Sequence, residues 1–240
     1  MRYKMVVSYD GTNYHGYQAQ ENHPSIQASI EKALRLMTQL DIKTFAASRT
    51  DKGVHALYQV LHFDTDIDLE SDQWKDALHK RLPGDIRVIK VVKVKKDFHA
   101  RHNAKSKIYI YKLSKKPLNA FQSNHEVYIK NFNVELVKDH LNDLVGEHDF
   151  TAFSPNKEQK PPIKTIYSFT VKETKTHYIF KIHGNHFLRY MVRSIMGNII
   201  YMGLGKKPQD QLKLMLETKN RLLTAKTAPA EGLYLAHIYY

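Results

Sequence analysis

The chain has 240 residues, of which 42% are hydrophobic and 25% charged, with a formal net charge of +13; this is the composition of a globular protein with a real hydrophobic core. Because it contains no cysteine, a disulfide framework, a thiolate nucleophile and a cysteine-ligated zinc are excluded. It has no run of 18 apolar residues and no signal-peptide layout, so we expect a cytoplasmic protein with no membrane partner.

The first half of the chain predicts the order strand, helix, strand, strand, helix, strand. The expected elements are a strand at Tyr3–Tyr9, a helix after Pro24 with Ser25 as its N-cap, strands at Thr44–Ser48 and Leu57–Phe63, a helix at about Ser71–Arg81 and a strand at Ile86–Val94. This order is typical of a ferredoxin-like sandwich, in which helices cover one face of an antiparallel sheet.

The second half predicts a similar unit with longer insertions. The expected elements are a strand at Ser106–Ser114, a helix at Val134–Leu144, a loop from Gly146 to Pro162, a hairpin of Ile163–Glu173 and His177–Gly184, helices at His186–Met202 and Pro208–Glu217, and a strand at Leu233–Tyr240. We therefore predict an α+β protein of two ferredoxin-like halves, residues 1–103 and 104–240, with their sheets side by side and an active cleft between them.

The octet Arg49-Thr50-Asp51-Lys52-Gly53-Val54-His55-Ala56 places a carboxylate beside an arginine, just before a glycine. It lies between two predicted strands, and a loop held by strands is a rigid support for a reacting side chain. Arg49 would favour the ionised form of Asp51. Taken alone, however, Asp-Lys-Gly is also an ordinary turn, in which the aspartate bonds its own backbone.

Most of the positive charge falls within residues 87–116, which hold 11 Lys and Arg against one acid, Asp97. Aromatic and histidine residues are interleaved with these cations, including Phe98, His99 and His102. Cations that neutralise phosphates beside rings that stack on unpaired bases indicate a nucleic-acid partner. The alternative is a lysine-rich strand edge that discourages aggregation.

The predicted helix 186–202 is apolar on most of its circumference, which indicates burial, yet it carries Arg189 and Arg193 four residues apart. A buried guanidinium needs an anionic partner. One of these arginines could pair with Asp51 across the cleft, or each could pair with any nearby acid or extend to solvent.

Six sequence blocks, in order from residue 9 to residue 235, resemble the signatures of the TruA-type tRNA pseudouridine synthases. They are YDGTNYHGYQ at 9–18, RTDKGVHA at 49–56, FHAR at 98–101 with KIYIY at 107–111, GEHDFTAF at 146–153, FLRYMVR at 187–193 with Gly197, and APAEGLYL at 228–235. Ser48, Lys52, Tyr17 and Tyr190 depart from residues common in that family.

This resemblance implies an isomerase that converts uridine to pseudouridine in the anticodon stem-loop of tRNA, at expected tRNA positions 38, 39 and 40, without a cofactor or metal. Asp51 would be the catalytic carboxylate and Tyr109 would pack against the target base. Arg193 would pair with Asp51, Arg49 would hold the extruded nucleotide, and Leu233 would help to close an apolar pocket.

The resemblance also implies a homodimer with tRNA spanning both subunits. Among the cations, we expect RNA contacts from Arg101, Lys105, Lys107 and Lys52.

Two other classes of protein stay open from the residues alone. The first is an RNA-binding module that keeps this fold without turnover. The second is a phosphate-directed hydrolase or nuclease, which would usually need a metal site; the 14 histidines form no His-x-x-x-His helix motif with an acid between them.

Overall fold

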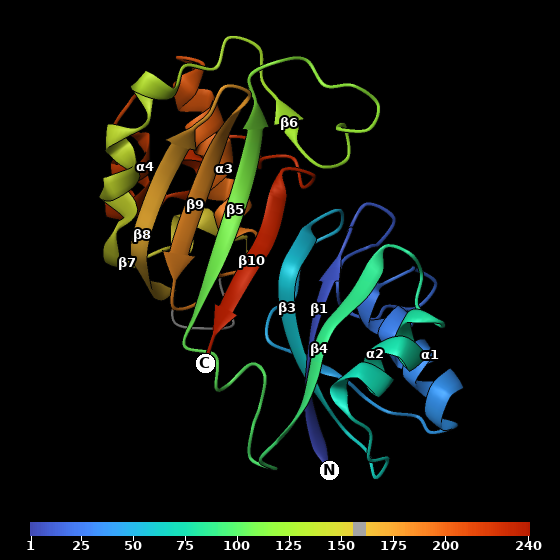
Figure 1. Cartoon of the computed structure of the whole chain (residues 1–240). Coiled ribbons are helices and arrows are strands. Elements are labelled where there is room, and N and C mark those ends of the chain that lie inside the picture. The colour runs from blue at the N-terminus through green and yellow to red at the C-terminus, as the bar shows by residue number, and fades with distance from the viewer. Residues whose placement is uncertain (156–161) are drawn as a thin grey trace. The chain divides into compact units, whose positions relative to one another are not determined.

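The computed structural model describes residues 1–155 and 162–240 and is a mixed α+β fold with mostly antiparallel strands (Figure 1). It separates into two compact units, Met1–Lys105 with Tyr234–Tyr240 (unit 1), and Ser106–Leu233 (unit 2). In the described part of the chain, every helix is too short or too polar to cross a membrane.

Unit 1 confirms the predicted order of elements. They are β1 (Arg2–Tyr9), α1 (Ile26–Thr38), β2 (Phe45–Ala46), β3 (His55–Asp64), α2 (Ser71–His79) and β4 (Ile86–Val94). The antiparallel strand order is β4-β1-β3-β2, and β10 (Leu233–Tyr239) pairs in parallel with β3. The Ser25 side chain accepts a hydrogen bond from the Ala28 amide and caps α1, as predicted.

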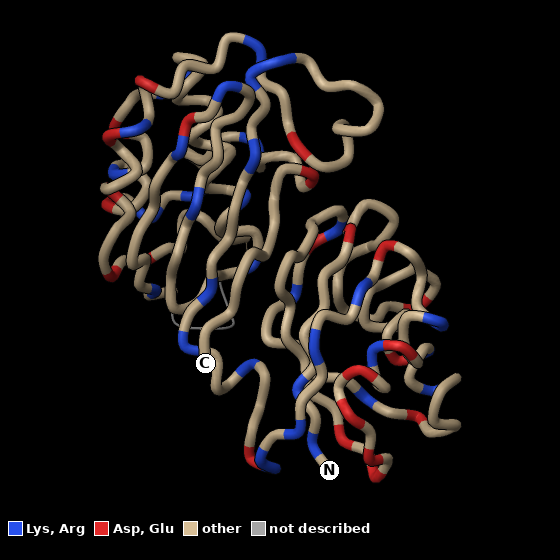
Figure 2. Tube along the Cα trace, in the orientation of Figure 1, with Lys and Arg blue, Asp and Glu red and all other residues tan. Residues whose placement is uncertain are grey.

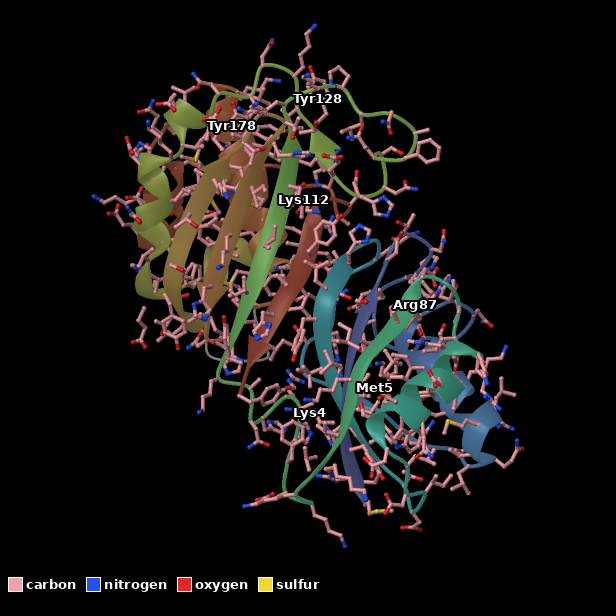
Figure 3. The ribbon with its side chains drawn as sticks, in the orientation of Figure 1. Lys4, Met5, Arg87, Lys112, Tyr128 and Tyr178 are labelled. Atoms are coloured by element: carbon pink, nitrogen blue, oxygen red, sulfur yellow. The ribbon has the colours of Figure 1, made fainter. Side chains whose placement is uncertain are left out.

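The helices of unit 1 cover one face of its sheet (Figure 1). Trp74 of α2 is fully buried and makes edge contacts with Tyr3 and Phe63, each at 5.3 Å between ring centroids. Lys4 and Met5, labelled in Figure 3, are consecutive in β1 and so lie on opposite faces. Met5 is fully buried with the core, whereas Lys4 lies on the face without helices.

Unit 2 has the antiparallel strand order β5-β9-β8-β7, with β6 parallel to β5. Its elements are β5 (Ser106–Ser114), β6 (Val127–Tyr128), β7 (Gly146–Asp149), β8 (Ile163–Glu173), β9 (His177–Gly184), α3 (Met191–Gly203) and α4 (Gln211–Thr218). Among the described residues, unit 2 also has short 3₁₀ helices at Val134–Leu136, Asp139–Leu144, Thr151–Phe153 and Arg221–Leu223. The predicted hairpin of β8 and β9 is confirmed at its stated bounds.

Three predicted elements of unit 2 were wrong in detail. The helix expected at Val134–Leu144 is two 3₁₀ helices, because the backbone leaves the helical region at Val137 with φ −130°. Part of the loop expected at 146–162 is strand β7, paired with β8, while residues 156–161 lie outside the described residues. The helix expected from His186 begins at Met191, because Tyr190 has a left-handed φ of +61°.

Candidate active site

The loop that carries Asp51, residues 47–54, is closed at its base by the side chain of Gln59. Gln59 is fully buried in β3. Its amide nitrogen donates to the Ser48 carbonyl at 2.6 Å, and its amide oxygen accepts from the Ser48 amide at 3.3 Å. The Ala47 amide donates to the Val60 carbonyl at 2.8 Å. A side chain thus continues the strand ladder where the backbone pairing stops, which keeps the loop rigid.

Thr50, the residue before Asp51, is held by the end of β1 and by the segment that follows it. Its carbonyl accepts from the Tyr17 amide at 3.1 Å, and its hydroxyl lies 2.8 Å from the Tyr9 hydroxyl in a buried hydrogen bond. Gly16 has φ +99°, and a β-carbon there would lie 2.7 Å from the Thr50 oxygen. Two blocks far apart in the sequence therefore meet as one structure, and glycine is required at the point of contact.

Asp51 itself begins a tight turn. The Val54 amide donates to the Asp51 carbonyl at 3.1 Å, and Gly53 adopts φ +76°, which suits glycine. The Gly53 amide donates a long hydrogen bond to the Tyr14 carbonyl at 3.4 Å. The Asp51 side chain is half-buried. Backbone contacts on both sides therefore determine where its carboxylate is presented.

Two cations, Arg49 and Lys52, lie close to Asp51 in the sequence, and both are exposed. The Nζ of Lys52 lies 3.1 Å from Nε2 of His15, whose ring stacks on His23 at 4.3 Å. Burial, Lys52 and His23 all lower the pKa of His15. A neutral His15 accepts from the ammonium, so Lys52 is held beside the loop.

His55, at the start of β3, has a structural position. It is 2% exposed, its Nδ1 accepts from the Gly11 amide at 3.1 Å, and its ring stacks on Tyr234 at 4.7 Å. A β-carbon on Gly11 would lie 2.1 Å from the Val54 oxygen, so this glycine too permits a close backbone approach to the Asp51 loop.

In unit 2, Tyr109 lies on β5 and is 7% exposed. Its ring meets the edge of Phe187 at 5.1 Å and 80°. Phe187 in turn packs against Gly184, where a β-carbon would lie 3.0 Å from the Phe187 ring. The tyrosine is therefore fixed by an aromatic contact from the segment that leads into α3.

Arg193, in the first turn of α3, is tied to the segment that precedes β10. Its Nε donates to the Ala228 carbonyl at 2.9 Å, and the Ala228 amide donates to the Arg193 carbonyl at 3.0 Å. One turn later, a β-carbon on Gly197 would lie 2.2 Å from the Lys226 oxygen. These reciprocal bonds and the close approach hold the half-buried arginine in one orientation.

The same segment is anchored to β5 beside Tyr109. The Tyr111 hydroxyl donates to the Pro229 carbonyl at 2.9 Å, and Gly232 lies flat against the Tyr111 ring. Burial, the largest cause, raises the pKa of Tyr111. Leu233 follows, 4% exposed, with its amide donating to Ala230 at 2.9 Å. Unit 2 thus ties Arg193 and Leu233 to one anchored segment, which is bonded to β5 at Tyr111, two residues from Tyr109.

Arg189 does not share a helical stripe with Arg193, which corrects our expectation. It is exposed and precedes α3. Both guanidinium groups lie against the Tyr190 ring, at 5.0 and 5.5 Å from its centroid. The burial that the apolar pattern predicted is confirmed for most of α3, whereas Arg193 is only half-buried and Arg189 is exposed, and both arginines make a cation–π contact with Tyr190.

The predicted RNA-contact cations lie at different depths. Arg101 and Lys105 are exposed in the segment after β4, where Figure 2 shows Lys and Arg following one another. Lys107, on β5, is 6% exposed. Arg101 and Lys105 therefore offer accessible charge, whereas Lys107 shares the buried face of β5 with Tyr109.

Comparison with known proteins identifies the family. A family model described as tRNA pseudouridine synthase matches residues 5–103 and 141–240. The chain belongs to the tRNA pseudouridine synthase family. It is 43% identical over 238 residues to "tRNA pseudouridine synthase A" of Aster yellows witches'-broom phytoplasma, covering 99% of this chain and 98% of that protein. The proteins of the same name from Phytoplasma mali and Bacillus pumilus are 42% and 39% identical, covering 99% and 100% of this chain and 98% and 99% of their own lengths.

As a member of the tRNA pseudouridine synthase family, the chain carries Asp51, Arg193 and Leu233 inside the matched ranges, while Tyr109 lies between them. Sequence reasoning assigned no role to Gln59 or to the hydroxyl of Tyr9. The one available signal was Gln59 itself, a polar residue within a largely apolar strand, since buried polar groups are kept for their hydrogen bonds.

Proposed function

We propose that Asp51 is the catalytic carboxylate with which this tRNA pseudouridine synthase isomerises uridine to pseudouridine. The observation that carries the proposal is the fixation of the Asp51 loop, whose backbone is bonded through Thr50 on one side and Gly53 on the other. A carboxylate presented in a fixed position loses little entropy when it meets its target.

The reaction breaks the N1–C1′ bond of the nucleoside and forms a C5–C1′ bond after the uracil turns, so that C5 loses a proton and N1 gains one. An ionised Asp51 would attack C1′, attack C6 of the base, or remove a proton from the sugar in a glycal route. All three routes need the carboxylate to be charged, which a nearby cation favours.

Four other residues have proposed roles at the substrate. Arg193 pairs with Asp51 and keeps it ionised, while Arg49 holds the extruded nucleotide. Tyr109 supports the target base and Leu233 excludes water from the pocket. Each proposal is supported by the family relationship, and those for Tyr109, Arg193 and Leu233 also by their fixed positions within unit 2.

We further infer that the substrate uridines lie in the anticodon stem-loop, that Arg101, Lys105, Lys107 and Lys52 contact the RNA, and that the enzyme acts in the cytoplasm as a homodimer. The two predicted ferredoxin-like halves, 1–103 and 104–240, would supply the catalytic loop and its complement. The strand order β4-β1-β3-β2 of unit 1 supports this assignment for the first half.

The decisive experiment compares Asp51→Asn with Asp66→Asn in tritium release from tRNA that contains 5-tritiated uridine. Asp66 is fully exposed and serves as the control. We expect Asp51→Asn to abolish release while tRNA affinity stays within a few-fold, and Asp66→Asn to behave like the unchanged protein. Turnover by Asp51→Asn would remove the assignment, and tRNA binding without release by the unchanged protein would indicate a non-catalytic module.

A further inference from the structure

A cluster of aromatic rings lies on unit 1 at the far end of β3 from the Asp51 loop. It consists of Phe45, His62, His99 and His102, which we call the ring platform. Phe45 and His62 are cross-strand partners with ring centroids 5.1 Å apart and planes inclined by 21°. His99 lies 4.7 Å from His62 and 4.1 Å from His102. Phe45 is 51% exposed and His102 is exposed, so part of the platform faces solvent.

The segment that supplies His99 and His102 is held against the face of the sheet that lacks helices. The Ala100 amide donates to Nδ1 of His62 at 3.1 Å, and the Tyr240 hydroxyl donates to the Ala100 carbonyl at 2.7 Å. Arg2 donates to the Phe98 carbonyl at 2.9 Å. The rings are therefore fixed before any partner arrives, which lowers the entropy lost on binding.

The internal hydrogen bonds of the segment set its shape. The amides of Arg101 and His102 donate to Nδ1 of His99 at 3.1 and 3.3 Å, so the neutral imidazole organises the turn. Burial lowers the pKa of His99, and burial together with His99 and Arg2 lowers the pKa of His62 to about 4. Both rings are uncharged at neutral pH, which suits stacking.

Charge around the platform comes from other side chains. The exposed cations of this segment are Lys95, Lys96, Arg101 and Lys105, against the single acid Asp97. An exposed aromatic face bordered by cations complements a base with its phosphates, because every base offers a π-face and every phosphate a negative charge. A protein partner would need a larger apolar surface than one half-exposed phenylalanine.

We propose that the ring platform is a second RNA-binding site, on which an unpaired base of the tRNA stacks against Phe45 while Arg101 contacts an adjacent phosphate. The inference rests on the proposed function in taking tRNA as the partner. His62 lies seven residues along β3 from His55, roughly 20 Å at the rise of a strand, so the platform is separate from the reacting carboxylate. Its role is to bind and position the RNA.

The test compares Phe45→Ala, Phe45→Trp and the control Leu36→Ala in the full-length protein. Leu36 is as exposed as Phe45, at 51%, but lies on α1. The readouts are the dissociation constant for an unmodified tRNA transcript and the rate of tritium release at saturating tRNA. We expect Phe45→Ala to weaken binding about tenfold, the loss of one stacked base, with the saturated rate unchanged. Phe45→Trp keeps the affinity, and so does Leu36→Ala.

Two results would overturn the inference. One is a Phe45→Ala protein that binds tRNA as tightly as Leu36→Ala. The other is a Phe45→Trp protein that loses as much affinity as Phe45→Ala, which would mean that Phe45 only packs against His62. Failure of the proposed function is a separate result, the absence of tritium release from the unchanged protein, and the binding comparison does not depend on it.

Discussion

Gly16 and Thr50, 34 residues apart in the sequence, lie so close together that a β-carbon on the glycine would be 2.7 Å from the backbone carbonyl oxygen of the threonine. The neighbouring Tyr17 amide bonds that same oxygen at 3.1 Å. The position of Asp51, one residue further along the chain, therefore depends on a glycine from a different block.

Gly16→Ala should displace the Asp51 loop. The methyl group meets a backbone oxygen, and the left-handed φ adds a cost of about 1 kcal/mol. We expect tritium release to fall at least about tenfold, in line with the sensitivity of catalysis to small displacements. Gly205→Ala is the matched control, because Gly205 also has a positive φ but has open space around it; equal losses in both variants would contradict the explanation.

Gln59→Leu should loosen the base of the same loop. The change leaves the Ser48 amide and carbonyl without the side chain that now bonds both. Unpaired polar groups cost about 1–3 kcal/mol when they are buried, so the free energy of unfolding should fall by about 2 kcal/mol. Denaturant titration measures this loss, and Gln18→Leu, at an exposed position, should show almost none.

Arg193→Lys should impair catalysis although it keeps the charge. Lysine has one nitrogen and is unable to bond the Ala228 carbonyl and a carboxylate in the planar way that a guanidinium does. We expect kcat/KM for tRNA to fall about tenfold or more. Arg189→Lys, at the exposed neighbour that shares the Tyr190 contact, should stay within about twofold. Comparable losses in the two variants would argue against a special role for Arg193.

Arg101→Ala should weaken tRNA binding and reduce its dependence on salt. Each phosphate contact that is lost lowers the slope of log affinity against log salt by about one. Binding measured over a range of salt concentrations gives the slope. Arg81→Ala removes an exposed arginine at the end of α2 and serves as the control; an unchanged slope in Arg101→Ala would place that residue away from the RNA.

The stability of unit 1 should fall as the pH drops below 6.5. His62 has a pKa of about 4 when folded and about 6.5 when unfolded, so the unfolded chain binds the extra proton between these values. Stability is therefore highest above pH 6.5 and lost towards pH 4, by about 1 kcal/mol at pH 5 after allowing for solvent screening. His62→Asn keeps an acceptor for the Ala100 amide without a titrating ring, and its thermal melting should depend less on pH.

The prediction of strands and helices from the sequence succeeded where the hydrophobic period was clear. The β-branched residues of Ile86–Val94 predicted that strand at its observed bounds, and the two strands of the β8–β9 hairpin were also predicted at theirs, because β-branched residues favour strands locally. The apolar pattern of residues 186–202 predicted a helix correctly but placed its start too early. The left-handed backbone of Tyr190, which delays the start, does not change the pattern of hydrophobic residues.

For the site, the sequence by itself determined which chemical groups are available: a carboxylate next to an arginine, two tyrosines on a strand and a basic, ring-rich segment. Only the tertiary structure decided how they are held. Three sets of hydrogen bonds do this, between Thr50 and Tyr9, between Gln59 and Ser48, and between Arg193 and Ala228. They join residues between 11 and 41 positions apart. Such contacts follow from packing and backbone approach in three dimensions, whereas a pattern along the chain reports only what each residue does with its neighbours.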